Sequence, residues 1–425
     1  MRTLSYQLDR AHRWLVAAAV GLLPFQAFAA VPLELVGSFL AFDLLVMLAA
    51  VAGGPGIWAA RRQWLLAPAA WLAAALALPG IASELLQAQP ALGRRIAEQA
   101  APLVAVLVVG VAARDVGAAV VRRAAWVGGA LALGLGLLGW ALDLWTGSSR
   151  FSEHGLHPVF SGLPRLFGTF AGSPERLGSF TVYWLAMVLA GSSDKSRRCR
   201  RGSLALGGVA LLLSMSYAWV GGMLLAASRV PRRLRHWAVG AALLAVVCAS
   251  VPIVRGPPSA ELSGPCRALD VSHYLALRLA PGRCRRIAIE GRAVTAYQEA
   301  KRVSWLAFRD RPFVGVGYAG FPEVSERAFL ERYGGAGIHY TQPHGIFHGL
   351  AAKHGLLGLL GLCVWLAALW RGWRDSIWDG AVLGFLAIGL HIDVDRLREL
   401  WLVLAFLLAE QLAGPKDEDV DRIRR

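Results

Sequence analysis

Apolar stretches of about 17 to 25 residues recur along the whole chain and are separated by short polar segments. A stretch of that length crosses the hydrocarbon core of a bilayer as one α-helix. With 56% of its 425 residues hydrophobic and only 17% charged, the chain does not have the composition of a soluble protein. The sequence therefore predicts an all-α polytopic membrane protein, not the two or three soluble domains that its length alone would suggest.

About twelve membrane spans are predicted from these stretches. Residues 203–228 are interpreted as two short, tilted or broken helices, because an arginine cluster at each end requires an even number of crossings. The approximate bounds of the spans are 13–31, 34–52, 64–80, 97–113, 124–145, 177–191, 203–215, 217–228, 236–254, 345–369, 377–391 and 398–413.

Arginine clusters orient the chain in the membrane. Cytoplasmic loops carry an excess of Lys and Arg, so both chain ends are predicted to be cytoplasmic. Arg396 and Arg398 are the exception, because they fall on the outer side, next to Asp393 and Asp395. The clusters that agree are Arg2, Arg10 and Arg13; Arg61 and Arg62; Arg114, Arg122 and Arg123; Arg197 to Arg201; Arg229 to Arg235; and Arg371 and Arg374.

This orientation divides the chain into four parts. Residues 1–254 form an N-terminal transmembrane bundle of about nine spans, with an outer loop over 146–176. Residues 255–343 form a large outer segment with amphipathic helices, 344–413 the C-terminal transmembrane helices, and 414–425 a cytoplasmic tail. The outer segment has thirteen Lys and Arg residues against eight Asp and Glu. Its charge suits anionic lipid head groups and a phosphorylated substrate equally well.

Two of the five cysteines, Cys266 and Cys284, lie in this outer segment. An oxidising compartment permits a disulfide between them. We therefore expect the two to pair, the alternative being two unpaired thiols.

Two motif-like patterns do not carry their usual meaning. The stretch from Gly315 to Gly320 spells G-x-G-x-x-G, but a dinucleotide fingerprint needs a strand before it and a helix opening from it. Pro312 and Pro322 flank this one. His344 and His348 have the spacing of two metal ligands on a helix, but Gly345 stands where a zincin has its glutamate. No metal and no other cofactor is expected, and no nucleic-acid partner.

Residues 287–308 are predicted to form a helix outside the membrane that ends before Pro312. On a 3.6-residue period Arg302, Trp305 and Arg309 share one face. Such a face is typical of an amphipathic helix that lies on the membrane with snorkelling arginines. It also offers guanidinium groups to an anionic ligand.

The order of the motifs along the chain favours the second interpretation. The stretch RVSWLAFRDRPFVGVGYAGF (302–321), followed by QPHGIFHGLAAKHGLLGLLGL (342–362), resembles the signature region of the O-antigen ligase and polymerase superfamily. In that family a helix with an arginine and a tryptophan leads to a Pro-x-x-Gly-x-Gly turn, and a histidine later precedes a Gly-x-x-Gly membrane helix. RLFGTFAGSPERLGSF (165–180) is similar to the family's Gly-Thr-Phe segment. The matching residues are Arg302, Trp305, Pro312, Gly315, Gly317, His344, Gly355 and Gly358.

The chain departs from the family pattern at two positions. Gly345 stands after the histidine, where an amide or hydroxyl residue is usual. The family's Ser-Arg pair near its seventh span is here Ser216-Tyr217. Arg165 or Arg176 is expected to supply the missing guanidinium, unless it is dispensable.

The resemblance implies transfer of a glycan from undecaprenyl diphosphate to an acceptor, on the periplasmic face of the bacterial inner (cytoplasmic) membrane. It also implies a glycosyltransferase C-like fold, with membrane lipids around it; for a ligase the acceptor is a sugar of the lipid A core. This chemistry needs a base of near-neutral pKa for the acceptor hydroxyl and cations for the leaving diphosphate. His344 is the expected base, with His339 as second candidate. Arg302 is the expected diphosphate clamp, with Arg165, Arg176 and Arg309 as further members of the cluster.

Other functions stay open. A polymerase of the same superfamily would use a second lipid-linked glycan as acceptor, and protein-directed members use Ser or Thr of a pilin-like protein. A transporter of lipid-linked sugar is the non-enzymatic alternative. It would predict internal repeats and ionisable residues deep inside several spans.

Overall fold

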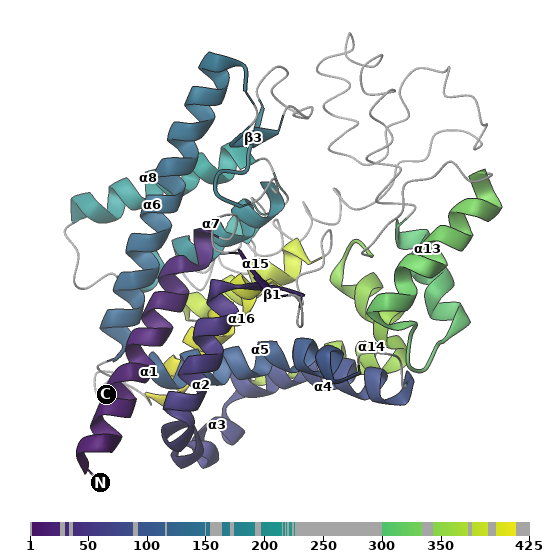
Figure 1. Cartoon of the computed structure of the whole chain (residues 1–425), viewed down its shortest axis with the longest axis horizontal. Helices are drawn as coiled ribbons and strands as arrows, with labels where there is room; N and C mark the ends of the chain where they lie inside the picture. The colour runs from purple at the N-terminus through teal and green to yellow at the C-terminus, as the bar shows by residue number, and fades with distance from the viewer. Residues whose placement is uncertain are drawn as a thin grey trace, which may run out of the picture.

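The computed structural model describes residues 2–25, 30–33, 37–87, 92–114, 117–148, 150–153, 164–170, 174–191, 197–214, 216, 218, 221–222, 225, 300–333, 343–372, 376–389 and 397–413. Figure 1 shows the arrangement of its helices and short strands. They are α1 (Arg2–Leu22), η1 (Leu23–Phe25), β1 (Ala30–Leu33), β2 (Gly37–Leu40), α2 (Ala41–Ala59), α3 (Arg61–Leu66), α4 (Pro68–Gln87), α5 (Leu92–Ala112), α6 (Gly117–Thr146), β3 (Ser152–Glu153), β4 (Arg165–Leu166), α7 (Pro174–Ala190), α8 (Arg197–Ser214), α13 (Gly317–Tyr333), α14 (Ile346–Gly372), α15 (Ile377–Ile388) and α16 (Arg398–Leu412). A further helix covers residues 300–310.

The described part of the chain is a multi-span, all-α membrane protein with two short antiparallel strand pairs. This confirms the predicted class, whereas the predicted count of about twelve spans is not shown. By length and apolar composition, five helices in the described residues are candidate membrane spans. They are Ala41–Ala59, Pro68–Gln87, Arg95–Ala112, Ala119–Thr146 and Ile346–Leu369.

The N-terminal region differs from the prediction. The span predicted at 13–31 is α1, which begins near the chain start and ends at Leu22. The strands β1 and β2 then pair antiparallel, so the span predicted at 34–52 begins only with α2. Pro24 and Pro32 interrupt this apolar run, and proline stops a helix because its ring clashes with the preceding turn and removes a backbone donor. Apolar content alone does not separate helix from strand.

Three of the predicted spans are short helices enclosed by protein. The predictions at 177–191, 377–391 and 398–413 correspond to α7, α15 and α16, which have 17, 12 and 15 residues. Twelve residues extend only about 18 Å, against roughly 30 Å of hydrocarbon. The middle of α16 is buried on all sides, because the helix packs against α4, α5, α7 and α15. The spans predicted at 217–228 and 236–254 lie largely or wholly outside the described residues.

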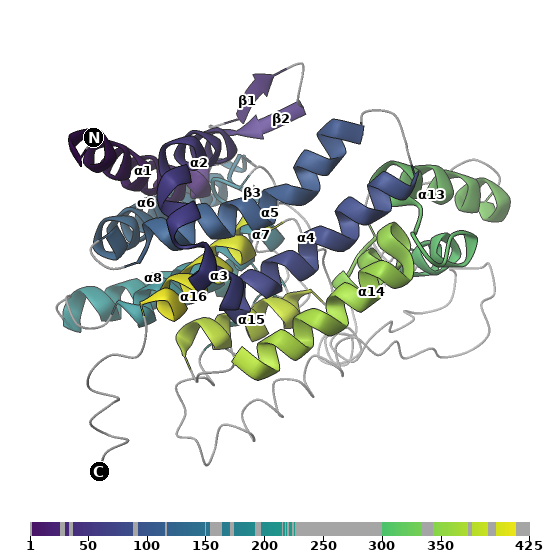
Figure 2. The same ribbon diagram turned by 90° about the horizontal axis from the view of Figure 1, so that it is seen from below.

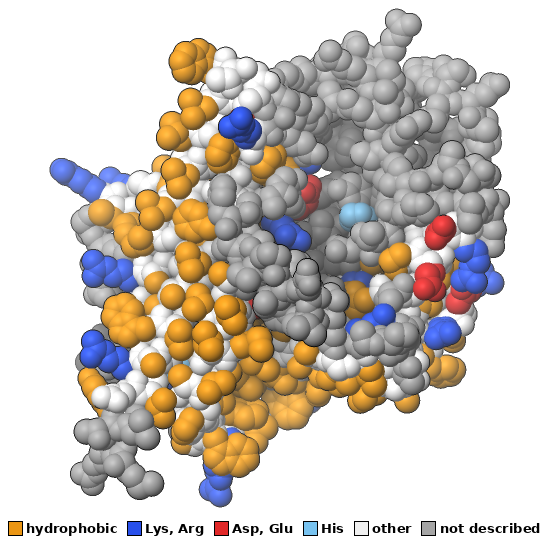
Figure 3. Space-filling view, viewed as in Figure 1, with side chains coloured by type: hydrophobic (Ala, Val, Ile, Leu, Met, Phe, Trp, Pro, Cys, Tyr) orange, Lys and Arg blue, Asp and Glu red, His pale blue; other side chains and the backbone are white. Residues whose placement is uncertain are grey.

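The outer helices present apolar side chains to the surroundings. In Figure 3 hydrophobic side chains cover the left and lower parts of the face, with single Lys and Arg side chains at its edges, whereas acidic and basic side chains lie together on the right, near α13. Figure 2 shows α4 and α14 running side by side, and the contacts between them are extensive. Exposed Leu, Val and Trp side chains in such numbers indicate contact with lipid, because water would make them costly.

The helices alternate between two ends of the bundle. At one end Arg114 donates to the Oε1 atom of Gln63 at 3.3 Å, and the backbone N–H of Ala69 donates to the Oε1 atom of Gln411 at 3.0 Å. Arg371, close to the end of α14, lines a cavity with residues of α3 and α4. We call this the basic end, after Arg61, Arg62, Arg114 and Arg371. The opposite end, where α2, α5, α7, α14 and α16 begin, is called the site end.

Arginines at the site end are paired with carboxylates. Arg398, predicted as an exception to the charge rule, donates from Nε and Nη2 to the two carboxylate oxygens of Asp43, at 2.8 and 2.5 Å. Arg95, in the first turn of α5, lies 3.5 Å from the carboxylate of the fully buried Glu84. The sequence prediction did not count Arg95 among its exceptions. Because each charge is neutralised by a neighbouring helix, these arginines do not conflict with the orientation of the chain.

A break in α14 connects this helix to the residues before α13. Gly355 has φ 61° and ψ −144°, a conformation open essentially to glycine alone. The turn 312–316 fills the break: the backbone N–H of Leu356 donates to the carbonyl of Pro312 at 2.7 Å, and that of Val316 donates to the carbonyl of Ala352 at 2.9 Å. The two glycine motifs of the sequence are thus two halves of one backbone contact.

Side chains of α4 fix this contact from the other side. The hydroxyl of Ser83 donates to the carbonyl of Val314 at 2.5 Å. The amide of Gln87 donates to the carbonyls of Val314 and Gly315 at 3.2 and 3.1 Å. The turn 312–316 is therefore held between α4 and α14, and it carries the helix over 300–310 with it.

We expect Gly355→Ala to lower the free energy of unfolding by about 2–5 kcal/mol. The new Cβ would lie 2.6 Å from the carbonyl carbon of Phe313, and the backbone angles would be strained. The apparent Tm of the detergent-solubilised protein measures this. Gly134→Ala is the matched control, because a Cβ there meets no atom within 4 Å. Equal Tm values for the two variants would contradict the close backbone contact between the turn 312–316 and Gly355.

We expect Arg398→Gln to lower the free energy of unfolding by about 1–3 kcal/mol, because it removes the guanidinium that donates to both oxygens of the largely buried Asp43 carboxylate. The double variant Asp43→Asn, Arg398→Gln should lose less than the sum of the single variants, in a double-mutant cycle of unfolding free energies. The exposed pair Arg13–Asp9 is the control, with an expected coupling below about 0.5 kcal/mol. If the double variant loses as much unfolding free energy as the two single variants together, the pairing of Arg398 with Asp43 is refuted.

Candidate functional site

At the site end, the starts of α7 and α14 lie with the ends of α8 and α15 among the candidate site residues. The N-terminus of α14 is tied to α15, because the backbone N–H of Ile346 donates to the carbonyl of Gly389 at 2.5 Å. Gly345 just before it has φ 115°, a region that side chains other than glycine rarely adopt. This backbone requirement is the physical reason why glycine replaces the amide or hydroxyl residue that the family resemblance leads one to expect after His344.

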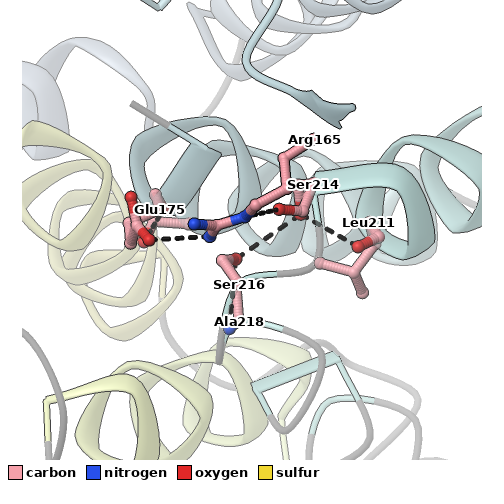
Figure 4. A network of polar contacts seen from close by, with 7 residues as sticks. Arg165, Glu175, Leu211, Ser214, Ser216 and Ala218 are labelled. Atoms are coloured by element: carbon pink, nitrogen blue, oxygen red, sulfur yellow. Dashed lines mark hydrogen bonds and ion pairs between the residues drawn. The ribbon is translucent and has the colours of Figure 1, made fainter. Parts of the chain in front are cut away.

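Arg165 joins three segments that are distant in the sequence. Its Nη2 atom donates to Oε1 of Glu175, in the first turn of α7, at 2.7 Å. Its Nε atom donates to the carbonyl of Ser214, the last residue of α8, at 3.3 Å. The hydroxyls of Ser214 and Ser216 lie 3.4 Å apart, and Figure 4 shows the whole network. Arg165 thus lies beside Ser216, the position after which the resembled family has its arginine.

His344 lies just before α14 and is partly buried. Burial lowers the pKa of its imidazole to about 4; the carboxylate of Glu175 acts against this, and the ammonium of Lys301 adds to it. The sequence led us to expect a base of near-neutral pKa. In the structure burial is the largest influence on this pKa and lowers it. The ring is neutral at pH 7 and can accept a proton.

The helix over 300–310 brings further cations to this region. Lys301 acts electrostatically on both His344 and His348. Arg302, the next residue, is partly buried, and its Nη2 atom is shielded from solvent. Trp305 is 55% exposed and stacks on Phe308. The opposite face of this helix packs on α13 through small side chains.

The predicted site residues divide into four groups. Arg165 and His344 are brought into one neighbourhood through Glu175. Arg302 lies one residue from Lys301 on the same helix. Arg176 and Arg309 are exposed. Three predicted residues lie outside the described part of the chain: His339 and the two cysteines of the expected disulfide, Cys266 and Cys284.

Glu175 and Lys301 were not predicted as site residues. Glu175 stands in the Pro-Glu turn of the stretch 165–180, so that motif contained the signal, but the carboxylate was not given a role. Lys301, next to Arg302, was given no role. Their proximity to His344 depends on how α7 and the helix over 300–310 pack, which spacing along the chain does not reveal.

The arrangement suits proton transfer beside an anion. A neutral imidazole lies near one carboxylate, and Lys301, Arg165 and Arg302 supply positive charge in a partly shielded region. Within the described residues no three His, Cys, Asp or Glu side chains are grouped to hold a metal ion. A polar hollow of about 400 Å³ lies further along, lined by residues that include Asp310, Arg311 and Arg327, and it does not include His344.

His344 makes stability depend on pH. Because its pKa is about 4 in the folded protein and 6.5 ordinarily, the unfolded chain takes up a proton first as the pH falls. Folded stability is therefore lost between about pH 6.5 and 4. We expect His344→Gln to remove part of this loss, so that the apparent Tm of the variant gains on that of the wild type as pH falls through this window. Parallel Tm curves would contradict the depressed pKa.

A scan of protein-family models and a search of curated proteins found no match to this chain. Its class follows from the structure itself: the chain is a multi-span helical membrane protein, with ionisable side chains gathered where α7 and α14 begin.

Proposed function

We propose that the protein is an O-antigen ligase, which transfers a glycan from undecaprenyl diphosphate to a sugar of the lipid A core at the periplasmic face of the inner membrane. The observation that carries this proposal is the junction of His344 with the Glu175–Arg165 pair and Lys301 at one end of a membrane bundle. A base and several cations at the start of membrane helices suit a substrate whose diphosphate lies at the surface while its polyprenyl tail stays in the bilayer.

The proposed reaction is a single displacement. The acceptor hydroxyl attacks the anomeric carbon, and its proton passes to a ring nitrogen of His344. The new glycosidic C–O bond forms as the bond between the anomeric carbon and the diphosphate oxygen breaks. The bonding pair leaves with the diphosphate, whose growing charge is stabilised by Arg302, with Lys301 and Arg165 nearby. Bound diphosphate also raises the pKa of His344, because a negative charge favours the imidazolium. The configuration at the anomeric carbon inverts.

The resemblance to the ligase and polymerase superfamily supports the same proposal. It rests on the ordered motifs over 165–180 and 302–362. The contact between the turn 312–316 and Gly355 gives a physical reason for two of these motifs to occur together. The position of Arg165 beside Ser216 supports its role as the guanidinium that Tyr217 does not supply.

One observation bears on the transport alternative. Lys353 and His354 are 2% and 1% exposed inside α14, directly before its break, and a broken helix with buried ionisable residues is typical of transporters. Here, however, the turn 312–316 and Ser83 bond the backbone groups around the break, and the Lys353 ammonium lies 4.3 Å from the centre of the Tyr318 ring. A structural role for the break favours the enzyme. A polymerase would use the same site with a second lipid-linked glycan as acceptor.

The function is tested with purified protein, lipid-linked glycan and rough lipopolysaccharide, with no nucleotide or metal added. Glycan-modified lipopolysaccharide on a gel supports the ligase. Longer lipid-linked glycan in place of it identifies a polymerase. Absence of both products, with glycan moved across proteoliposomes, identifies a transporter.

We expect His344→Ala to abolish transfer and Arg302→Ala to reduce its rate about 30- to 1,000-fold, which corresponds to roughly 2–4 kcal/mol of transition-state stabilisation. Arg302→Lys should recover only part of the rate, because an ammonium does not reproduce the planar fork of a guanidinium.

The matched control for these variants is Arg311→Ala, an exposed arginine just beyond the same helix. It should keep the wild-type rate. Size-exclusion profiles establish that each variant is folded. Wild-type activity in folded His344→Ala would rule out this histidine as the base.

A further inference from the structure

The guanidinium of Arg165 is bonded to the carboxylate of Glu175. It uses an N–H group of the kind with which arginine also binds phosphate. Its Nη2 atom, on the terminal edge of the fork, donates to Oε1 of Glu175 at 2.7 Å. Arginine binds carboxylates and phosphates through the same planar arrangement of N–H groups. Both side chains are partly accessible, with 19% of Arg165 and 25% of Glu175 exposed. A diphosphate that binds Arg165 through its Nη2 atom therefore competes with Glu175 for this donor.

Glu175 stands where an anion is favoured in any case. It lies in the first turn of α7, where unpaired backbone N–H groups and the helix dipole stabilise negative charge. The same carboxylate acts on the imidazole of His344, on which Lys301 acts with the opposite sign. The carboxylate of Glu175 thus acts on both the guanidinium of Arg165 and the imidazole of His344.

We propose, resting on the proposed function, that Glu175 is a positioning residue that couples donor binding to the base: it holds Arg165 while the site is empty and is released toward His344 when the donor's diphosphate takes Arg165. The released carboxylate then pairs with the imidazolium that forms when His344 accepts the proton of the acceptor hydroxyl. The base is thereby strengthened only when the donor is bound. Before the donor binds, His344 therefore takes up a proton less readily.

The first test measures binding of farnesyl diphosphate, a short polyprenyl diphosphate, to the full-length protein in detergent. Glu175→Gln should lower its Kd about three- to ten-fold, because Arg165 is no longer occupied by a charged partner. In an Arg165→Gln background the same substitution should change the Kd less than about two-fold. An equal gain in both backgrounds would show simple charge repulsion and overturn the proposal.

Two further variants separate competition for Arg165 from other causes of a changed Kd. Glu175→Asp retains the charge but shortens the side chain, so its Kd should fall between those of the wild type and Glu175→Gln. Glu323→Gln removes an exposed carboxylate from α13 and should leave the Kd unchanged. A matching gain in Glu323→Gln would mean that overall charge, not competition for Arg165, controls binding.

The second test follows the ring of His344 by NMR, in protein with labelled histidine. The charged groups acting on it are Glu175 from α7 and Lys301 from the helix over 300–310. Farnesyl diphosphate should raise the pKa of His344 more in the wild type than in Glu175→Gln, because only the wild type has a carboxylate to release. Equal shifts would overturn the coupling. Binding to neither protein would instead reject the diphosphate-binding function, while binding without coupling rejects only the role of Glu175.

Discussion

The contact between the turn 312–316 and the break at Gly355 fixes the helix over 300–310 relative to α14. A membrane helix cannot leave backbone groups unbonded in lipid, so a break needs partners from elsewhere in the protein. The carbonyl of Pro312 and the N–H of Val316 are those partners. Because the turn directly follows the helix over 300–310, satisfying the backbone of α14 also fixes that helix. This contact, together with the packing of the helix over 300–310 on α13, holds Lys301 within electrostatic reach of His344, which precedes α14.

Ion pairs also hold the site end together, because a charge in a medium of low dielectric constant needs a partner of opposite sign. Arg398 is bonded to Asp43, Arg95 lies near Glu84, and Arg165 is bonded to Glu175. Each pair joins two different segments, so each neutralises a cation and holds two parts of the bundle together. The third pair differs in that a histidine lies near its carboxylate. A pair that is shared in this way can exchange partners, which is the basis of the coupling proposed for Glu175.

Much of the candidate site could be predicted from residue types and their order along the chain. His344 and Arg302 were predicted from the ordered motifs, and Arg165 as a replacement for an absent arginine. Glu175 was not predicted, because a carboxylate in the first turn of a helix has many ordinary explanations. Its pairing with Arg165 depends on the packing of α7 beside β4, which spacing along the chain does not reveal. The depressed pKa of His344 was not foreseen for a related reason: burial is a property of packing, and burial is its largest cause.

The sequence by itself determined the class of the protein, because apolar stretches of span length recur too often for a soluble protein of this size to bury them all, and it determined that its arginines cluster between them. It did not determine that residues 30–40 include an antiparallel strand pair or that α15 has only 12 residues, since apolar content measures only the preference for a nonpolar environment. Tertiary structure alone decided which charges meet. Arg165 and Glu175 are ten residues apart, and Asp43 and Arg398 are 355 apart. Only the packing of helices brings such groups within bonding distance, because Coulomb attraction between side chains is strong at a few ångströms and weak beyond.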